Sequence, residues 1–390
     1  MNGSAAIAGI GQTEFSMDSG RSELTLACEA VSAALDDCGV APAEVDGLVT
    51  YSTDLNNEVE VARSTGIGAL TFYVRTGYGG GGTCAAILQA AMAVTTGVAR
   101  AVVVYRAFNE RSKTRYGRPQ PVVGWSDYVR RNAGGGSRWW PWYLPFGLGT
   151  PAQWSSIVFQ HYMHRYGVTN EDFGRYAVLA RTHAATNPAA FYAGKPLSLE
   201  EHQGSRWIVE PVLRRYDCCL ESDGGIALVI TSAARARDLR HPPAVIAAAA
   251  QGLAANGDVV SNYFHDDLAR FAELELVADQ LWRQSGLTVD DIDAAMIYDH
   301  FSPIVFMQLE AIGFCGPGEA NHFLADGYGT LDSPLPINTH GGLLGEAYIH
   351  GVNHITEATR QLRGTAANQL SSVDHVLVTA GMSGLILSRG

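Results

Sequence analysis

Two segments of the chain match each other closely enough to indicate a duplicated fold. Residues 33–51 (AALDDCGVAPAEVDGLVTY) correspond to residues 281–301 (LWRQSGLTVDDIDAAMIYDHF) at an offset of 247 residues, which aligns Tyr51 with Tyr298. Each copy has the pattern of a helix end, a glycine turn and an apolar strand. Two related α/β halves in a chain of 390 residues are expected to form a site where their strand ends meet.

The repeat also predicts where the chain divides. We expect an N-terminal half at residues 1–240, which includes a loop insertion at about 106–200, and a C-terminal half at residues 241–390. A buried strand at GGIALVIT ends the first half, and another at PAVIAAAAQG begins the second. The composition, with 47% apolar and 17% charged residues, is typical of a globular protein with a large core.

Charge and hydropathy exclude several classes of partner. The net charge is −12 and there is no run of Lys or Arg, which argues against binding to nucleic acid or to an anionic membrane. The apolar stretches are only as long as strands, and the N-terminus lacks the basic and apolar regions of a signal peptide. We therefore predict a cytoplasmic protein. Its six cysteines show no metal-ligand spacing and are expected to be reduced thiols.

A glycine-rich turn, GYGGGG at residues 77–82, precedes an alanine-rich helix. Four consecutive glycines allow another group to approach the backbone closely. The turn lacks the Lys-Ser/Thr of a nucleotide-binding loop, so a phosphate site is disfavoured. Cys84 follows the turn, where the helix N-terminus could lower its pKa and make it a nucleophile. It could equally be a small buried residue.

Glu346, His350 and His354 are spaced four residues apart, so a continuous helix would place them on one face, where they could bind a metal. The glycines of HGGLLG favour a loop in the first part of this segment. Ordinary hydrogen bonding by the two histidines is the favoured interpretation, and we expect no metal.

Four motifs in order give the chain a resemblance to a known family. They are DCCLESDGGIALVITSAARA, IYDHFSPIVFMQLEAIGFCGPGEA, LPINTHGGLLGEAYIHG and VLVTAGMSGLIL. Together they resemble the signatures of the thiolase superfamily, in its lipid-transfer-protein (sterol-carrier thiolase-like) branch, over essentially the whole chain. The resemblance implies a thiolase-like five-layered α-β-α-β-α fold with two related halves, which agrees with the repeat.

The departures from the family pattern indicate a different chemistry. The nucleophilic cysteine of these thiolases falls on Gly80, and their two catalytic histidines fall on Tyr298 and Tyr348. A second cysteine is also absent, because TAGMSG occupies its position near the C-terminus. Condensation through an acyl-cysteine is therefore excluded for this site, and an acyl-CoA site with two phenols remains.

A retro-aldol cleavage of a β-hydroxyacyl-CoA fits such a site, because it needs a base, an acid and stabilisation of an enolate but no covalent acyl carrier. We expect Tyr298 and Tyr348 to be the catalytic pair. A phenol titrates near pH 10 in water, so nearby groups must tune it. Asp299 and His300 are the adjacent candidates, and the alternation of side chains along a strand favours His300 on the side of Tyr298.

Stabilisation of the enolate oxygen needs hydrogen-bond donors. We expect backbone N–H groups around Gly341, Gly342 and Gly381 to supply them, with His340 as a further substrate-binding residue.

The segments SGRSELTLACEAV, YRAFNERS and HGGLLGEAYIHG, with YDHF, are similar to those of bacterial steroid side-chain aldolases of the lipid-transfer-protein type. This resemblance implies cleavage of a 17-hydroxy steroid 20-carboxyl-CoA to a 17-ketosteroid and propionyl-CoA, with no cofactor besides the CoA of the substrate. It also implies a homodimer bound to an OB-fold partner of the DUF35 type, as a heterotetramer. Two alternatives remain open, namely a scaffold that has lost catalysis and a thiolase that uses Cys84.

The insertion is rich in arginine and tryptophan. Its arginines suit either the phosphates of CoA or an acidic partner surface, and they include Arg111, Arg115, Arg118, Arg130, Arg131 and Arg138. The segment RWWPWYLPFG at its end could line an apolar substrate tunnel or simply pack in the core.

Overall fold

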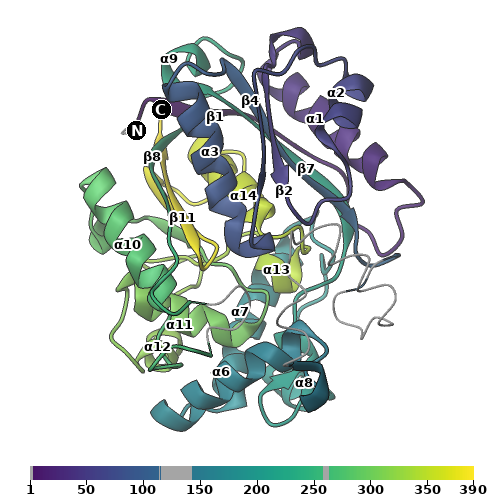
Figure 1. Cartoon of the computed structure of the whole chain (residues 1–390). Helices are drawn as coiled ribbons and strands as arrows, with labels where there is room; N and C mark the ends of the chain where they lie inside the picture. The colour runs from purple at the N-terminus through teal and green to yellow at the C-terminus, as the bar shows by residue number, and fades with distance from the viewer. Residues whose placement is uncertain (1–2, 114, 116–142, 258–262) are drawn as a thin grey trace.

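The computed structural model describes residues 3–113, 115, 143–257 and 263–390 (Figure 1). The main helices are α1 (Glu23–Cys38), α2 (Glu58–Thr65), α3 (Thr83–Thr95), α6 (Pro151–Tyr166), α7 (Asn170–Thr186), α8 (Leu199–Gln203), α9 (Ala233–Ala236), α10 (Ala272–Ser285), α11 (Ser302–Ile312), α12 (Ala320–Ala325), α13 (Gly342–Gly345) and α14 (Val352–Arg363). The strands are β1 (Ala5–Gln12), β2 (Gly47–Tyr51), β3 (Phe72–Thr76), β4 (Ala101–Asn109), β5 (Trp207–Val209), β6 (Leu213–Arg214), β7 (Asp223–Ser232), β8 (Ala244–Gln251), β9 (Ala294–Met296), β10 (His375–Thr379) and β11 (Ser383–Arg389). Within these residues no helix combines the length and the apolarity needed to cross a membrane.

The central sheet has a symmetric strand order. Nine strands of the described residues hydrogen-bond in the order β3-β2-β4-β7-β1-β8-β11-β10-β9, and β5 and β6 form a separate small hairpin. The two halves join where β1 and β8 pair antiparallel, with Ala6 opposite Val245. On either side, β2 pairs parallel with β4, and β9 pairs parallel with β10. The repeated sequence segments thus lead into equivalent strands, β2 and β9. The predicted boundary at residues 240 and 241 falls between α9 and β8.

Three apolar cores divide the molecule into layers. Along β1, Ala5 and Ile7 face a middle core that also holds α3 and α14, whereas Ala6 and Ala8 face an outer core with α1. Strands of the second half share the middle core and cover another outer core formed with α7, α10 and α11. Figure 1 shows α3 and α14 between the purple helices α1 and α2 and the green helices α10 and α11. The predicted five-layered thiolase-like α/β fold is confirmed.

Local sequence features set the ends of the helices and strands near the predicted active site. Ser22 caps α1 by accepting a hydrogen bond from the N–H of Thr25, and Gly39 ends the helix with a φ of 74°.

The start of the insertion was predicted wrongly, because β4 runs on to Asn109 and includes Arg106. The guanidinium of Arg106 is fully buried and pairs with the carboxylate of Asp54 at 2.9 Å, which allows a charged residue inside a strand. The segment 116–142, with Arg118, Arg130, Arg131, Arg138 and most of the tryptophan-rich stretch, lies outside the described residues.

Candidate active site

The two predicted catalytic phenols meet in the middle core. Tyr298 follows β9, and Tyr348 lies between α13 and α14. Their hydroxyl oxygens are 3.0 Å apart, so one phenol donates a hydrogen bond to the other. Tyr298 is only 6% exposed, and the Tyr348 ring packs against the same core. Two segments separated by fifty residues are thereby brought to one point, as the sequence predicted for this pair.

The hydroxyl of Tyr298 fills the space beside Gly80. Gly80 belongs to a 3-10 turn, η2 (Gly79–Gly82), and a Cβ atom added to it would lie 1.9 Å from Tyr298 Oη. A Cβ on Gly351 would likewise lie 2.8 Å from Tyr298 Cδ2. The Tyr298 ring therefore lies between two residues that must be glycine. A side chain at residue 80, including the cysteine of the related thiolases, is sterically incompatible with this phenol.

Asp299 points away from the tyrosine pair. Its carboxylate accepts hydrogen bonds from the hydroxyl of Tyr176 at 2.9 Å and from the N–H of Leu343 at 2.8 Å, and it lies 3.4 Å from His354 Nε2. Tyr176 belongs to the outer core and Tyr298 to the middle core, so Asp299 faces the opposite side of the chain. These interactions tie Asp299 to α7, α13 and α14, and none of them involves the hydroxyls of Tyr298 or Tyr348.

His300 lies on the side of the tyrosine pair. The centroids of the His300 and Tyr298 rings are 5.1 Å apart. Burial lowers the pKa of His300 to about 3, so its imidazole is neutral at pH 7. Its Nδ1 atom has no hydrogen-bond partner within the described part of the chain. His300 can therefore accept or donate one hydrogen bond towards a substrate, but it supplies no positive charge to stabilise a phenolate.

Burial raises the pKa of both Tyr298 and Tyr348 well above 10. The nearby carboxyl of Glu110 raises both values further, because a negative charge opposes ionisation of a phenol. Both phenols are accordingly protonated at neutral pH. A proton can pass along the hydrogen bond between the two phenols, but neither phenol is ionised and ready to act as a base.

The predicted enolate-binding donors separate into two groups. The N–H of Gly341 donates to the carbonyl of Asn338 at 2.8 Å, so this group is already used. His340 is buried, and its Nε2 is 3.0 Å from Nδ1 of His354. Gly342 packs against Asp299, because an added Cβ would lie 2.1 Å from the carboxylate. The contacts of Gly341, His340 and Gly342 described above are with other parts of the chain and not with the two phenols.

Gly381 lies nearer to the glycine-rich turn. It has a φ of 77° in the connection between β10 and β11. The hydroxyl of Ser383, two residues later, donates to the carbonyl of Gly81 at 2.7 Å. This contact places the Gly381 turn against η2, beside Gly80. Of the predicted glycines, Gly381 has the position best suited to bind an oxyanion close to Tyr298.

Cys84 is not placed as a nucleophile. Its side chain is fully buried, and its Sγ atom contacts the carbonyl oxygen of Val378 at 3.7 Å. Burial raises the pKa of this thiol, so the reactive thiolate is disfavoured. The geometry gives no support to the alternative of a thiolase that uses Cys84.

The three candidate metal ligands are each engaged by other side chains, and His340 lies near both Glu346 and His354. Helix α13 ends at Gly345 and α14 begins at Val352, so the continuous helix that would align the ligands is absent. Glu346 accepts hydrogen bonds from two asparagine side chains, His350 accepts one from Arg106 Nε at 3.1 Å, and His354 pairs with His340. Across the described ranges, no group of three or more His, Cys, Asp or Glu side chains is arranged to hold a metal.

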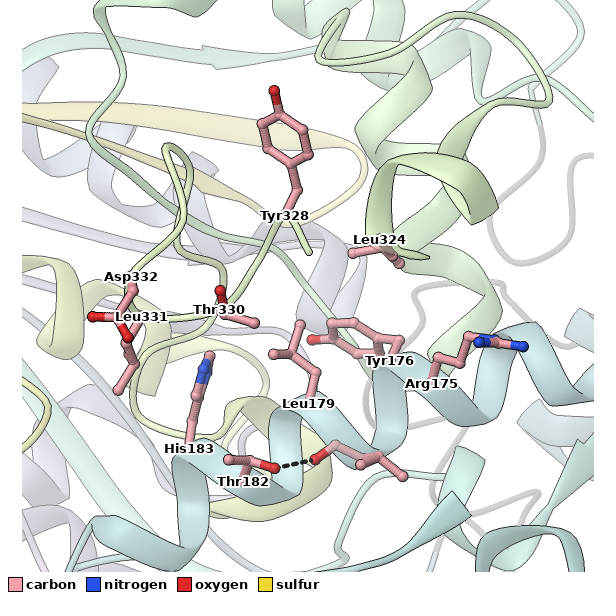
Figure 2. Close-up of a pocket in the computed structure, with 11 residues that line it drawn as sticks. Arg175, Tyr176, Leu179, Thr182, His183, Leu324, Tyr328, Thr330, Leu331 and Asp332 are labelled. Carbon is pink, nitrogen blue, oxygen red and sulfur yellow. Dashed lines mark hydrogen bonds between the residues drawn. The ribbon is translucent and has the colours of Figure 1, made fainter. Parts of the chain in front are cut away.

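A pocket of about 430 Å³ lies between α7 and the segment 324–332 (Figure 2). Figure 2 shows Tyr176, Leu179 and His183 on α7 facing the segment with Thr330 and Leu331. The pocket borders Tyr176, whose hydroxyl reaches Asp299, but the tyrosine pair lies in the middle core on the other side. The sequence does not reveal this pocket, because its walls come from two segments about 150 residues apart that share no motif.

Comparison with known proteins agrees with the geometry. Residues 258–389 match the family described as "Thiolase C-terminal domain-like". The chain is 56% identical to a steroid side-chain-cleaving aldolase of Thermomonospora curvata, over 99% of this chain and 98% of that protein. It is 53% identical to a 17-hydroxy-3-oxo-4-pregnene-20-carboxyl-CoA lyase of Mycobacterium tuberculosis, over 99% and 100% of the two chains. A solved structure described as an Ltp2-ChsH2(DUF35) aldolase has 54% identity and a TM-score of 0.92, and the match covers 100% of this chain and 98% of that one. The chain therefore belongs to the thiolase superfamily and, within it, to the steroid side-chain-cleaving aldolases, which are carbon–carbon lyases.

Proposed function

We propose that this aldolase cleaves a 17-hydroxy steroid 20-carboxyl-CoA thioester by a retro-aldol reaction in which Tyr298 and Tyr348 carry the proton. The 17-hydroxyl gives its proton to the oxygen of one phenol while that phenol passes its own proton along the hydrogen bond to the other, the bond between C17 and C20 breaks, and the electron pair of that bond forms the thioester enolate. C20 then takes a proton from the second phenol, which gives a 17-ketosteroid and propionyl-CoA and leaves both phenols neutral. The reaction is balanced without water or an oxidant. The substrate follows from the name of the relative in Mycobacterium tuberculosis.

The observation that carries the proposal is the hydrogen bond of 3.0 Å between the two phenols, formed in the space that Gly80 leaves open. A thiolase needs a nucleophile in that space, whereas a retro-aldolase needs only groups that move a proton and stabilise the enolate. A hydrogen-bonded pair of neutral phenols serves both purposes. One phenol can accept the hydroxyl proton as it passes its own to the other, and each can donate a hydrogen bond to an oxygen that gains negative charge. Gly381 and His300 are the nearest further groups for binding the thioester and the hydroxyl.

Product analysis tests the proposal directly. The purified chain is incubated with the steroid thioester, with and without a DUF35-type partner protein, and the products are identified by mass spectrometry. Wild type should release equal amounts of the 17-ketone and propionyl-CoA. Tyr298→Phe and Tyr348→Phe should each lower kcat by about 10²-fold or more, as expected for loss of an acid-base group, with unchanged circular dichroism. Tyr166→Phe, far from the pair, is the matched control. Full activity of both site variants would contradict the proposal.

The assembly is proposed to be a homodimer that binds an OB-fold partner of the DUF35 type as a heterotetramer. A DUF35 component is named in the related solved aldolase. In this chain, β3 is an edge strand of the sheet, and its Tyr73 is 68% exposed. An exposed edge strand is a natural site for pairing with a second copy. Arg111 and Arg115 are less available for a partner than the sequence indicated, because both pair with Glu221.

Light scattering tests the dimer. Wild type should have the mass of two chains, and Tyr73→Asp should reduce it to one by placing a charge in the paired edge. Val59→Asp, at another exposed apolar side chain on α2, should leave the mass unchanged. A wild-type monomer at micromolar concentration that is fully active alone would contradict both the dimer and the need for a partner. A cytoplasmic location stays a prediction from the sequence.

A further inference from the structure

A third group capable of proton transfer lies beside the tyrosine pair. In β4, Val102, Val104 and Phe108 face the middle core, whereas Val103 and Ala107 face the outer core. Glu110 follows directly after β4, and the same alternation directs its side chain to the middle core, where the phenols lie.

Neighbouring contacts place this end of β4 next to Tyr348. The rings of Phe108 and Tyr348 are 6.4 Å apart in an edge-to-face arrangement. Asn109 pairs with Asp223 in the sheet, and the hydroxyl of Ser222 accepts a hydrogen bond from the N–H of Tyr348 at 3.3 Å. Glu110 therefore lies at a junction of three chain segments, one of which carries the catalytic phenol.

The carboxyl group of Glu110 is buried, and one of its two oxygens lacks a hydrogen bond. The residue is 2% exposed, and its Oε2 atom has no hydrogen-bond partner among the described residues. An unsatisfied buried oxygen of this kind costs free energy and calls for a functional explanation. The titratable and charged groups around it are Arg106, Arg115, Glu221, Asp223, Cys219, Tyr298 and Tyr348.

Burial raises the pKa of Glu110 well above its ordinary value, and the carboxylate of Glu221 raises it further. Arg106 and Arg115 oppose this shift without reversing it. The carboxyl group consequently keeps its proton to a higher pH than an exposed glutamate does. A neutral carboxyl can donate a proton from one oxygen while it accepts another on its second oxygen, so no charge is created in the desolvated site.

We propose that Glu110 completes a proton relay with Tyr298 and Tyr348, giving up a proton through the phenols to the enolate carbon and recovering one from the β-hydroxyl of the substrate. The exchange is balanced, because the proton that leaves the hydroxyl replaces the one that reaches C20, and the carboxyl is regenerated in each turnover. This inference rests on the proposed retro-aldol function. It assigns Glu110 as a proton-relay residue that acts through the tyrosine pair.

The test uses Glu110→Gln, which keeps the size of the side chain but cannot exchange a proton in this way. We expect kcat to fall by about 10²-fold, with KM changed less than about threefold. Exchange of the C2 hydrogens of propionyl-CoA with D2O, followed by NMR, should fall in parallel, because it reports proton transfer to and from the enolate carbon alone. Glu357→Gln is the matched control, since Glu357 is a buried carboxyl on α14 with partners of its own. It should leave kcat and the exchange rate unchanged.

The pH profile gives a second readout that a structural role would not change. In wild type, kcat should fall on the alkaline side as Glu110 loses its proton, and this limb should be missing in Glu110→Gln and present in Glu110→Asp. If Glu110→Gln does not fold, a wild-type profile with no alkaline limb below the titration of the phenols overturns the inference. Wild-type kcat, exchange and pH profile in folded Glu110→Gln also overturn it. Absence of ketone formation by wild type, in contrast, contradicts the retro-aldol function itself.

Discussion

Substitution of Gly80 by alanine should lower kcat strongly, because the added methyl group displaces the hydroxyl oxygen of Tyr298. The added Cβ would lie 1.9 Å from Tyr298 Oη, and real Cβ contacts are essentially never shorter than 3.0 Å. The phenol must therefore move by about 1 Å. It cannot move freely, because its ring also packs on Gly351, where an added Cβ would lie 2.8 Å from Cδ2. A shift of this size breaks the hydrogen bond of 3.0 Å to Tyr348.

Two effects of this clash can be estimated. Overpacking of a filled core costs about 1–3 kcal/mol of unfolding free energy. Misplacement of a catalytic group by about 1 Å lowers the rate by about 10²-fold. Backbone strain adds nothing, because Gly80 is not among the glycines with positive φ. The loss of activity should therefore be larger than the loss of stability would explain.

The assay compares steady-state kcat and denaturant unfolding for Gly80→Ala and Gly81→Ala. Gly81 is the matched control, because its added Cβ would make only ordinary van der Waals contacts, at 3.4 Å to Met382 Sδ and at 3.6 Å to the carbonyl oxygen of Ala380. In a Tyr298→Ala background, which is itself destabilised by the cavity, Gly80→Ala should cause no further loss of stability, because the steric conflict is then absent. Wild-type activity and stability in Gly80→Ala would refute the reasoning.

Four further outcomes follow from buried groups. Cys84→Ala should keep wild-type kcat, and an acyl adduct on this thiol detected by mass spectrometry would contradict the mechanism. Asp54→Asn should lower the unfolding free energy by about 3–5 kcal/mol, because it leaves the buried Arg106 without its carboxylate; a change below about 1 kcal/mol in a urea titration would show that the pair is dispensable. Burial raises the pKa of Glu346 to about 7 from 4.5, so the folded chain holds a proton that the unfolded chain releases, and stability falls as pH rises through that window. Glu346→Gln should remove about 2 kcal/mol of this fall, measured by denaturation at pH 5 and pH 7.5, and an unchanged slope would disprove the shift. Dialysis against a chelator should leave activity unchanged, whereas recovery of activity only on adding a metal would indicate a Lewis acid at the enolate.

The sequence predicted the features that depend on local patterns or on the repeat. Gly39 and Gly286 both end helices with positive φ, and the strands that follow them occupy equivalent places in the sheet. Tyr298 and Tyr348 could be paired in advance because each replaces a catalytic residue of a related family. The alternation of side chains also gave the opposite directions of Asp299 and His300, since it depends only on an extended backbone.

The features that the sequence did not reveal depend on contacts between distant segments. The expected insertion began at Arg106, whereas this residue lies inside β4, because its carboxylate partner Asp54 comes from a distant part of the chain. Glu110 carries no local signal, because burial and the missing partner of its carboxyl appear only when three segments meet. Gly341 is less suited to the expected role for a similar reason, since its N–H already donates to the carbonyl of Asn338.

The contact between Gly80 and Tyr298 also constrains how the two chemistries can be exchanged during evolution. A cysteine at residue 80 cannot coexist with the phenol at residue 298, because the Cβ alone would overlap the oxygen. In a chain with cysteine at residue 80, the change to glycine must therefore come first, and the aromatic ring can then fill the vacated volume. The reverse exchange has the same order, because the ring must become smaller before residue 80 can carry a side chain again. In both directions the intermediate carries neither the thiol nor the phenol, so acyl transfer and the phenol-based chemistry cannot be exchanged by one substitution.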